Sequence, residues 1–157
     1  MNTSKLQKSI ELALEKGQKP FYVNAIAGST VLGMFDDFQA ISNICKKHSI
    51  WMHVDASWGG PAILSKTHNA LMKGVELADS VTWSPHKGMG IANQCSALII
   101  NNHLGALERS NSSNAEYLFQ KNEENEFTLG DKTLQCGRKN DALKFWLAWK
   151  WHGRKGF

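Results

Sequence analysis

The sequence predicts an α/β fold in which a mostly parallel sheet is flanked by helices. Short apolar runs alternate along the chain with amphipathic stretches of about ten residues, which is the pattern of strands joined by crossover helices. Several apolar runs end in small or polar residues, as buried strands do where they meet a loop. The chain has 157 residues, 42% of them hydrophobic, and no linker or repeat divides it, so we expect a single core.

The first predicted helix covers residues 4–17. Ser4 can cap its N-terminus and Gly17 can end it, because a serine oxygen accepts a free backbone N–H and glycine tolerates the left-handed conformation after a helix. Apolar residues recur at helical spacing, so they are expected to face the core. They are Leu6, Ile10, Ala13 and Leu14.

A buried strand is predicted over residues 21–28 and a second helix over residues 38–48. The strand runs into a turn of small residues at 28–30, and either Asp36 or Asp37 can cap the helix that follows. The spacing of the apolar residues predicts which side of the helix faces inward. That side carries Phe38, Ile41, Ile44 and Cys45.

Three further strands are predicted over residues 50–55, 79–83 and 95–100. The loop at residues 56–61 follows the first of them, and a glycine-rich connection joins the other two. Residues 140–153 predict a helix that is apolar on more than one face. Such a helix is expected to be buried against other protein.

Charge and cysteine content narrow the class of protein. The formal net charge is +4, but no long basic run interleaves with aromatic residues, so we expect no nucleic-acid partner. Cys45, Cys95 and Cys136 form no C-x-x-C pair and the six histidines form no i, i+4 pair, which predicts neither a disulfide framework nor a metal site. Most of the histidines are expected to be structural or solvated. Without a signal-peptide pattern or an apolar run long enough to span a membrane, the thiols predict a cytoplasmic protein.

Two charged residues lie where predicted strands end. Asp55 closes an apolar strand, which is the place where open α/β sheets bind ligands, although a helix cap or a salt bridge would also explain a single acid there. Lys87 follows another strand end in the sequence SPHKGMG. Pro85 sets the direction in which the chain leaves that strand, and Gly88 and Gly90 permit a close backbone approach or a positive φ. A solvated surface lysine needs none of this.

An acid and a lysine at one sheet edge suit a pyridoxal phosphate site. The lysine forms a Schiff base, and the acid keeps the pyridine nitrogen protonated so that the ring can accept electrons. The hydroxyls of the turn at residues 28–30 could contact such a cofactor, although most turns of this kind are only turns. An unrelated phosphate-binding α/β module is the other interpretation at this point.

Nearly the whole chain resembles the group II pyridoxal phosphate-dependent amino acid decarboxylases, most of all the branch that acts on glutamate and cysteine sulfinate. The resemblance is carried, in order and at matching spacing, by residues 21–60, 78–90 (ADSVTWSPHKGMG), 94–100 (QCSALII), 117–120 (YLFQ) and 130–150. It implies a fold type I pyridoxal phosphate enzyme, with residues 1–157 forming part of its large, cofactor-binding domain. The N-terminal part of that domain would precede Met1, and the small C-terminal domain would follow Phe157.

The resemblance also implies roles for individual residues. Lys87 would form the Schiff base with pyridoxal 5′-phosphate, and Asp55 would pair with the pyridine nitrogen. The other implied positions are Thr30 beside the phenolic oxygen, Ser57 against one face of the ring, Ser84 and His86 near the phosphate and the lysine, and Tyr117 as the mobile-loop tyrosine that protonates the substrate's α-carbon. Without the resemblance, Tyr117 would be interpreted as a packed aromatic.

The chain departs from the family pattern in three places. Ser84 stands where the family usually has asparagine, and its shorter hydroxyl would hold phosphate less well. Ser29 replaces a threonine. The segment at residues 121–132 is shorter than its counterparts, which could alter the closure of the loop over the site.

The expected function is decarboxylation of a small acidic amino acid by a cytosolic enzyme that is a homodimer in its full-length form. Glutamate, cysteine sulfinate and aspartate all remain candidates, because the residue that would bind the substrate's side-chain acid is not in this chain. The alternative is a catalytically inactive truncated paralogue or remnant of such a decarboxylase. These 157 residues alone are expected to be inactive.

Overall fold

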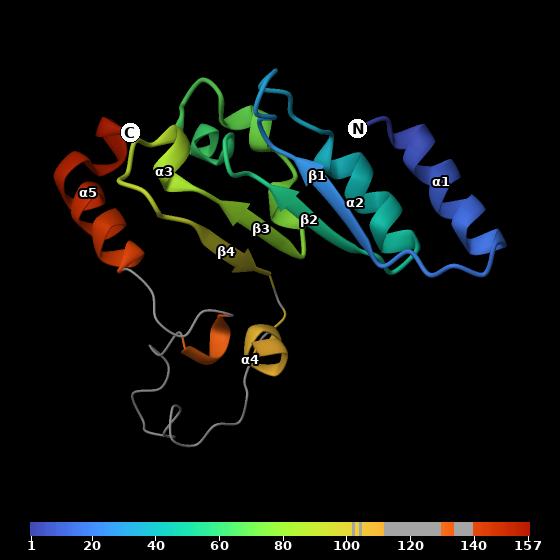
Figure 1. Ribbon diagram of the computed structural model, residues 1–157. Coiled ribbons are helices and arrows are strands. Elements are labelled where there is room, and N and C mark those ends of the chain that lie inside the picture. The colour runs from blue at the N-terminus through green and yellow to red at the C-terminus, as the bar shows by residue number, and fades with distance from the viewer. Residues whose placement is uncertain (102, 104, 112–129, 134–139) are drawn as a thin grey trace. The chain divides into compact units, whose positions relative to one another are not determined.

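The computed structural model describes residues 1–101, 103, 105–111, 130–133 and 140–157, and these form two compact units (Figure 1). The first unit joins Met1–Asn101 to Asp141–Phe157, and it holds the sheet. The second unit is Asn102–Asn140. Its described part contains the helix α4 (Ala106–Asn111) and the short 3₁₀ helix η5 (Gly130–Lys132).

The sheet has four strands in the order β1-β2-β3-β4. The strands are β1 (Tyr22–Ile26), β2 (Trp51–Asp55), β3 (Ser80–Trp83) and β4 (Ala97–Ile100). The first three strands are parallel, and β4 pairs antiparallel with β3. The predicted α/β fold with a mostly parallel sheet is therefore confirmed.

Crossover segments connect the parallel strands, as parallel pairing requires. The helix α2 (Phe38–Lys47) carries the chain from β1 to β2. Between β2 and β3 the chain makes three short 3₁₀ helices. They are η1 (Gly60–Leu64), η2 (Asn69–Met72) and η3 (Val75–Leu77).

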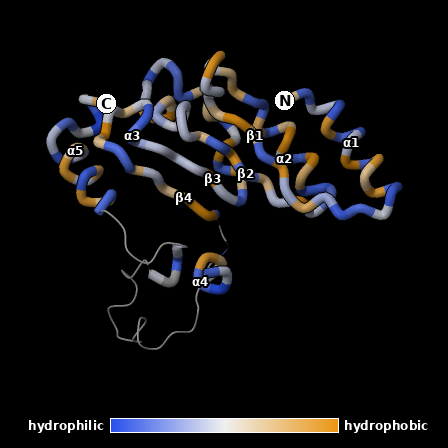
Figure 2. The backbone as a smooth tube through the Cα atoms, viewed as in Figure 1, coloured by the Kyte–Doolittle hydropathy of each residue, from blue (hydrophilic) through white to orange (hydrophobic). Residues whose placement is uncertain are grey.

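The first helix, α1 (Thr3–Glu15), has a different cap from the one predicted. The side chain of Asn2 accepts a hydrogen bond from the backbone N–H of Lys5 at 2.9 Å, so Ser4 lies inside the first turn instead of capping it. Gly17 has a φ of 72° just after the helix, as the prediction required. Figure 2 shows apolar and polar residues alternating along α1. Only Ile10 of its apolar face is fully buried, and Leu14 is exposed.

The helix α2 forms the core against one face of the sheet. Asp37 caps it by accepting a hydrogen bond from the backbone N–H of Ala40 at 3.0 Å, whereas Asp36 accepts one from the N–H of Ile26 at 2.8 Å. The alternation of β1 and β2 places every second residue on this face. The buried side chains that meet there are Phe38, Ile41 and Cys45 of α2 with Val23, Ala25, Met52 and Val54 of the strands. Ile44 is only partly buried.

The last helix is α5 (Asp141–Gly156), close to its predicted bounds. It is apolar on more than one side, but none of its residues is buried, and Trp151 remains 85% exposed. Phe145 contacts the sheet at Trp83, since the two rings pack edge-to-face at a centroid distance of 5.3 Å. Gly153 has non-helical backbone angles, at the residue where the sequence predicted the helix to end.

Cys45 and Cys95 are buried free thiols, whereas Cys136 lies outside the described residues. Within the described part of the chain, no helix has both the length and the apolar character needed to cross a membrane.

Candidate functional site

The carboxyl ends of β1, β2 and β3 meet at one edge of the sheet because the three strands are parallel. Asp55 is the last residue of β2, and Ser57 follows it directly. Beyond β3 comes the short helix α3 (Pro85–Gly88), which carries His86 and Lys87. The structure therefore brings these side chains to the same edge, as the sequence predicted.

The other predicted site residues fall in three different places. Ser84 lies at the same edge, just before α3, and its side chain is buried. Thr30 lies in the turn after β1 and is exposed. Tyr117 lies outside the described residues, so its predicted role stays a prediction.

Asp55 is held as a carboxylate by its surroundings. The backbone N–H of Ser57 donates to its Oδ1 at 3.0 Å, and the Ser57 side chain donates to the carboxyl group as well. Burial alone would raise the pKa of Asp55, but these hydrogen bonds and the nearby charges of Lys87 and His53 outweigh burial and lower the pKa below 3.8. Asp55 is therefore ionised at neutral pH.

Lys87 extends from α3 toward the loop after β2. Its Nζ lies 5.6 Å from the centre of the Trp58 ring, within the range of a cation–π contact. Gly88 explains how the two segments approach each other, since a Cβ added there would lie 3.1 Å from the Trp58 carbonyl oxygen and from Pro61. Gly90 has a φ of 66°. Both glycines thus serve the purposes that the sequence predicted, one by close approach and one by its backbone angle.

Two more glycines join the loops after β1 and β2. A Cβ at Gly28 would lie 2.7 Å from the backbone nitrogen of Gly59, and a Cβ at Gly59 would lie 2.5 Å from the carbonyl oxygen of Ala27. The N–H of Gly59 donates to that same oxygen at 2.9 Å. The backbone of the loop that follows Asp55 is therefore fixed against the end of β1.

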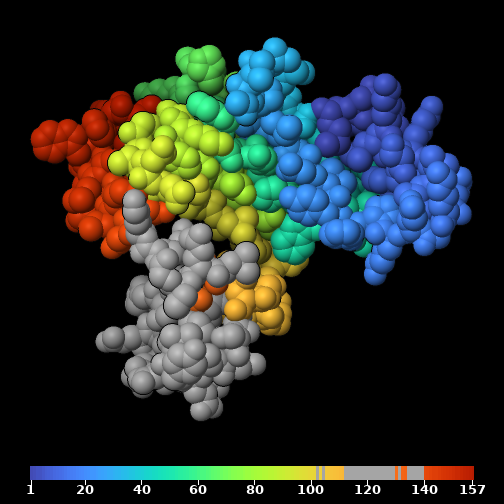
Figure 3. Space-filling model, viewed as in Figure 1, coloured from blue at the N-terminus to red at the C-terminus, as the bar shows by residue number. Residues whose placement is uncertain are grey.

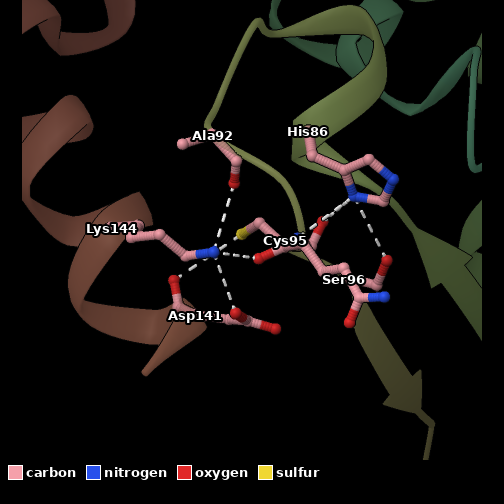
Figure 4. Close-up of polar contacts among 7 residues, drawn as sticks. His86, Ala92, Cys95, Ser96, Asp141 and Lys144 are labelled. Atoms are coloured by element: carbon pink, nitrogen blue, oxygen red, sulfur yellow. Dashed lines mark hydrogen bonds and ion pairs between the residues drawn. The ribbon is translucent and has the colours of Figure 1, made fainter. Parts of the chain in front are cut away.

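The segment that leads into β4 contacts the Nδ1 side of the His86 ring (Figure 4). Its Nδ1 lies 2.6 Å from the carbonyl oxygen of Cys95 and 3.5 Å from Oγ of Ser96. The Ser84 hydroxyl is hydrogen-bonded to the same Ser96 Oγ at 3.0 Å. Ser84, which stands where the family usually has asparagine, thus already has a hydrogen-bond partner within the chain.

His53 is a site neighbour whose importance the sequence reasoning missed. Its Nδ1 lies 2.7 Å from Oγ of Ser80 and its Nε2 3.1 Å from Oγ1 of Thr82, while its ring stacks on Tyr22 at 5.9 Å. Burial lowers the pKa of His53 and the charge of Asp55 opposes this, with a net lowering. His53 precedes Asp55 by two residues, so the alternation of a strand already put both on one face.

Trp58 was also missed as a contact of the lysine. A tryptophan directly follows Ser57 in the sequence, but nothing local connects it with a lysine on another element. Only the close approach of the two loops brings the ring and the ammonium group together.

Comparison with known proteins identifies the family. The profile of the pyridoxal-dependent decarboxylase conserved domain matches residues 1–157. The chain belongs to this decarboxylase family. The resemblance inferred from the sequence is thereby confirmed.

The relatives of this chain include enzymes named for acidic amino acids. It is 47% identical over 153 residues to cysteine sulfinic acid decarboxylase of Rattus norvegicus, covering 96% of this chain and 31% of the relative. It is 45% identical over 158 residues to acidic amino acid decarboxylase GADL1 of Bos taurus, covering 99% of this chain and 30% of the relative. The chain therefore spans about a third of the length of the curated relatives it matches.

A crystal structure shares the fold. Mouse CSAD in its apo form superposes with a TM-score of 0.91 and 44% sequence identity, covering 99% of this chain and 32% of the mouse chain. The strands and helices described above thus correspond to one part of the fold of that protein.

Proposed function

We propose that the protein containing this chain decarboxylates a small acidic amino acid and that Lys87 binds the cofactor, pyridoxal 5′-phosphate, as a Schiff base. One observation carries the proposal. Asp55 ends β2 and Lys87 lies in α3, just after the neighbouring parallel strand β3, so the two side chains share one edge of the sheet, and Lys87 helps to lower the pKa of Asp55. The names of the relatives from rat and cattle support an acidic substrate. Glutamate, cysteine sulfinate and aspartate are the candidates.

The residues present fit such a cofactor. An Asp55 carboxylate that stays ionised suits a protonated ring nitrogen, and Ser57, which orients it, would lie against the ring. The ring nitrogen of His86 that faces away from Cys95 would donate to an anionic phosphate group when that nitrogen is protonated (Figure 4). Thr30 is exposed in the turn after β1 and would bind the phenolic oxygen. Ser84 fits less well, because its hydroxyl is bonded to Ser96.

Each of these residues then has a defined task. When bound, the cofactor supplies an electron sink for the bond that loses carbon dioxide. Asp55 keeps its negative charge throughout and so keeps the ring nitrogen protonated. The amine of Lys87 binds the cofactor before the substrate arrives and can carry a proton once it is released. Tyr117 would return a proton to the substrate's α-carbon.

Reductive trapping tests the assignment of Lys87. Borohydride treatment of the full-length protein loaded with pyridoxal 5′-phosphate should leave the reduced adduct on Lys87 alone, and Lys87→Ala should abolish it. Lys73→Ala, at another lysine of the sheet-bearing unit, should leave the adduct unchanged. An adduct found by mass spectrometry on a different lysine would refute the proposal.

The inactive-paralogue alternative is kept because of two observations. The chain spans about 31% of its relatives' length, and the Ser84 hydroxyl is already engaged by Ser96. This alternative predicts a full-length protein that shows no Schiff-base absorbance band when it is mixed with pyridoxal 5′-phosphate. The cytosolic location and the homodimer expected from the resemblance stay predictions.

A further inference from the structure

The segment between α3 and β4 is attached to two elements that lie far apart in the sequence. On one side, its backbone at Cys95 contacts His86 of α3. On the other side, its carbonyl groups at Ala92 and Gln94 contact Lys144 of α5. Figure 3 shows the atoms of α5 packed directly against this yellow-green part of the surface. The segment thus connects α5 to the residue next to Lys87.

Lys144 has a matched set of acceptors. Its ammonium group donates to the carbonyl oxygens of Ala92, at 3.2 Å, and of Gln94, and it forms an ion pair with Oδ1 of Asp141 at 3.0 Å. A lysine has three N–H donors, so these three acceptors can use all of them. The Cys95 thiol adds a fourth link, since it donates to the carbonyl oxygen of Asp141 at 3.7 Å. The start of α5 is therefore joined to the segment at several points (Figure 4).

The contact between Cys95 and His86 determines where the imidazole carries its hydrogen. A carbonyl oxygen can only accept, so a separation of 2.6 Å requires a hydrogen on Nδ1 of His86. The backbone N–H of Cys95 also lies 3.2 Å from Nδ1, and as a donor it would require the opposite tautomer. The carbonyl contact is the shorter by more than half an ångström and decides the assignment. Nε2 is then left with its lone pair, and Figure 4 shows that it faces away from this cluster.

We propose that Lys144 is a positioning residue for His86. By holding the backbone at Ala92 and Gln94, it fixes the Cys95 carbonyl in the place where that carbonyl selects the Nδ1–H form and orients the ring. The hydrogen bond made by one ring nitrogen sets the state of the other. Lys144 thus determines that Nε2 of His86 is the nitrogen that faces a ligand beside Lys87. It does so although Lys144 lies 57 residues after Lys87 in the sequence.

This inference rests on the proposed function only for the identity of the ligand, which would be the phosphate group of the cofactor. Nε2 binds an anion well only when it takes up a proton while Nδ1 keeps its own, so that the ring carries a positive charge. The Cys95 carbonyl can accept from Nδ1 whether or not Nε2 carries a proton, so it holds the ring in the same orientation in both states. Loss of the Lys144 contacts should therefore weaken recognition of phosphate more than recognition of the pyridoxal ring.

The test uses the full-length protein and its variant Lys144→Met, which keeps most of the side-chain length but removes the charge and the three donors. The ring nitrogens of ¹⁵N-labelled histidines are observed by NMR at about pH 8, where an ordinary histidine is neutral. The His86 signal is assigned by its loss in His86→Gln. Lys150→Met is the matched control, because Lys150 lies on the same helix and contacts only Trp146 among the described rings, at 5.7 Å.

The parent and Lys150→Met should show the hydrogen of His86 on Nδ1, and Lys144→Met should show a mixture of the two tautomers. Asp141→Asn, a milder change that leaves Lys144 in place, should show a smaller shift in the same direction and serves if Lys144→Met does not fold. An unchanged His86 signal in a folded variant would overturn the inference, whether or not the protein binds the cofactor.

A second measurement separates this inference from the proposed function. Lys144→Met should weaken binding of pyridoxal 5′-phosphate at least tenfold and binding of pyridoxal, which lacks the phosphate, less than twofold. Equal losses for both compounds would overturn the link to the phosphate group. A parent protein that binds neither compound would refute the proposed function, while the NMR result would still decide the role of Lys144.

Discussion

The charge on Asp55 is set by its neighbours on the sheet and in the following loop. Ser57 donates to its carboxylate, and Lys87 and His53 lie close enough to stabilise the negative charge. These contacts act in the direction opposite to burial, and together they lower the pKa of the acid. A charge held this way is ready to stabilise a cationic ring without being neutralised itself.

Asp55→Asn should therefore leave cofactor binding largely intact but reduce turnover about 100-fold or more, because an amide cannot stabilise the protonated ring nitrogen. The measurements are kcat and the dissociation constant of the cofactor in the full-length protein. Asp37→Asn is the control, since asparagine caps a helix as well as aspartate does and the Asp37 side chain is occupied by the N–H of Ala40 at the start of α2. Near-normal turnover in Asp55→Asn would show that Asp55 has only a structural role.

His53 predicts a pH dependence of stability. Burial lowers its pKa below 6.5, so the unfolded chain takes up a proton at a higher pH than the folded chain does. The free energy of unfolding should therefore fall as the pH drops from about 6.5 through the lowered pKa of the folded state. His53→Gln should flatten this part of the profile, as measured by urea unfolding between about pH 7.5 and pH 5.5. His68→Gln, at an exposed histidine, should leave the slope unchanged.

At the scale of elements, most boundaries could be predicted because local signals set them. Gly17 ends α1 in the left-handed conformation, and the side chain of Asp37 caps the start of α2. Ser4 was wrong as a cap because Asn2, two residues earlier, is as good an acceptor and reaches the N–H of Lys5. The direction of β4 could not be predicted, since it depends on how the segment after α3 folds back onto β3.

The contact between the loops after β1 and β2 gives a prediction at this scale. Gly28→Ala should reduce the free energy of unfolding by about 3 kcal/mol, because the added Cβ meets the Gly59 backbone and the φ of 78° disfavours alanine. Gly33→Ala shares the positive φ but meets no atom within 4 Å, so it should cost only about 1 kcal/mol. Equal losses in urea unfolding would show that the close approach contributes nothing.

At the scale of the whole molecule, the sequence predicted the fold class and the meeting of Asp55 with Lys87, because parallel strands bring their carboxyl ends together. The contacts that hold His86 in place could not be predicted from the sequence. They depend on a contact between Lys144 and Ala92, 52 residues apart, and no local pattern marks the pair. The expected burial of α5 against other protein stays a prediction, and among the described residues nothing covers Trp151.

Exposed apolar side chains predict how the 157-residue chain behaves by itself. Val31, Leu32 and Trp151 are each at least 75% exposed, so the isolated chain should self-associate as its concentration rises. Leu32→Ser should reduce this association in sedimentation experiments while changing the free energy of unfolding by no more than about 0.5 kcal/mol. A chain that stays monomeric at all concentrations would contradict the prediction.

The attachment of α5 through Lys144 also has a kinetic consequence. Contacts between residues far apart in the sequence require a large loop to close before they form, so they tend to be made late in folding. A contact absent from the folding transition state affects the rate of unfolding more than the rate of folding. The contacts of Lys144 would then form late in folding, and their loss would mainly shorten the lifetime of the native state around Lys87.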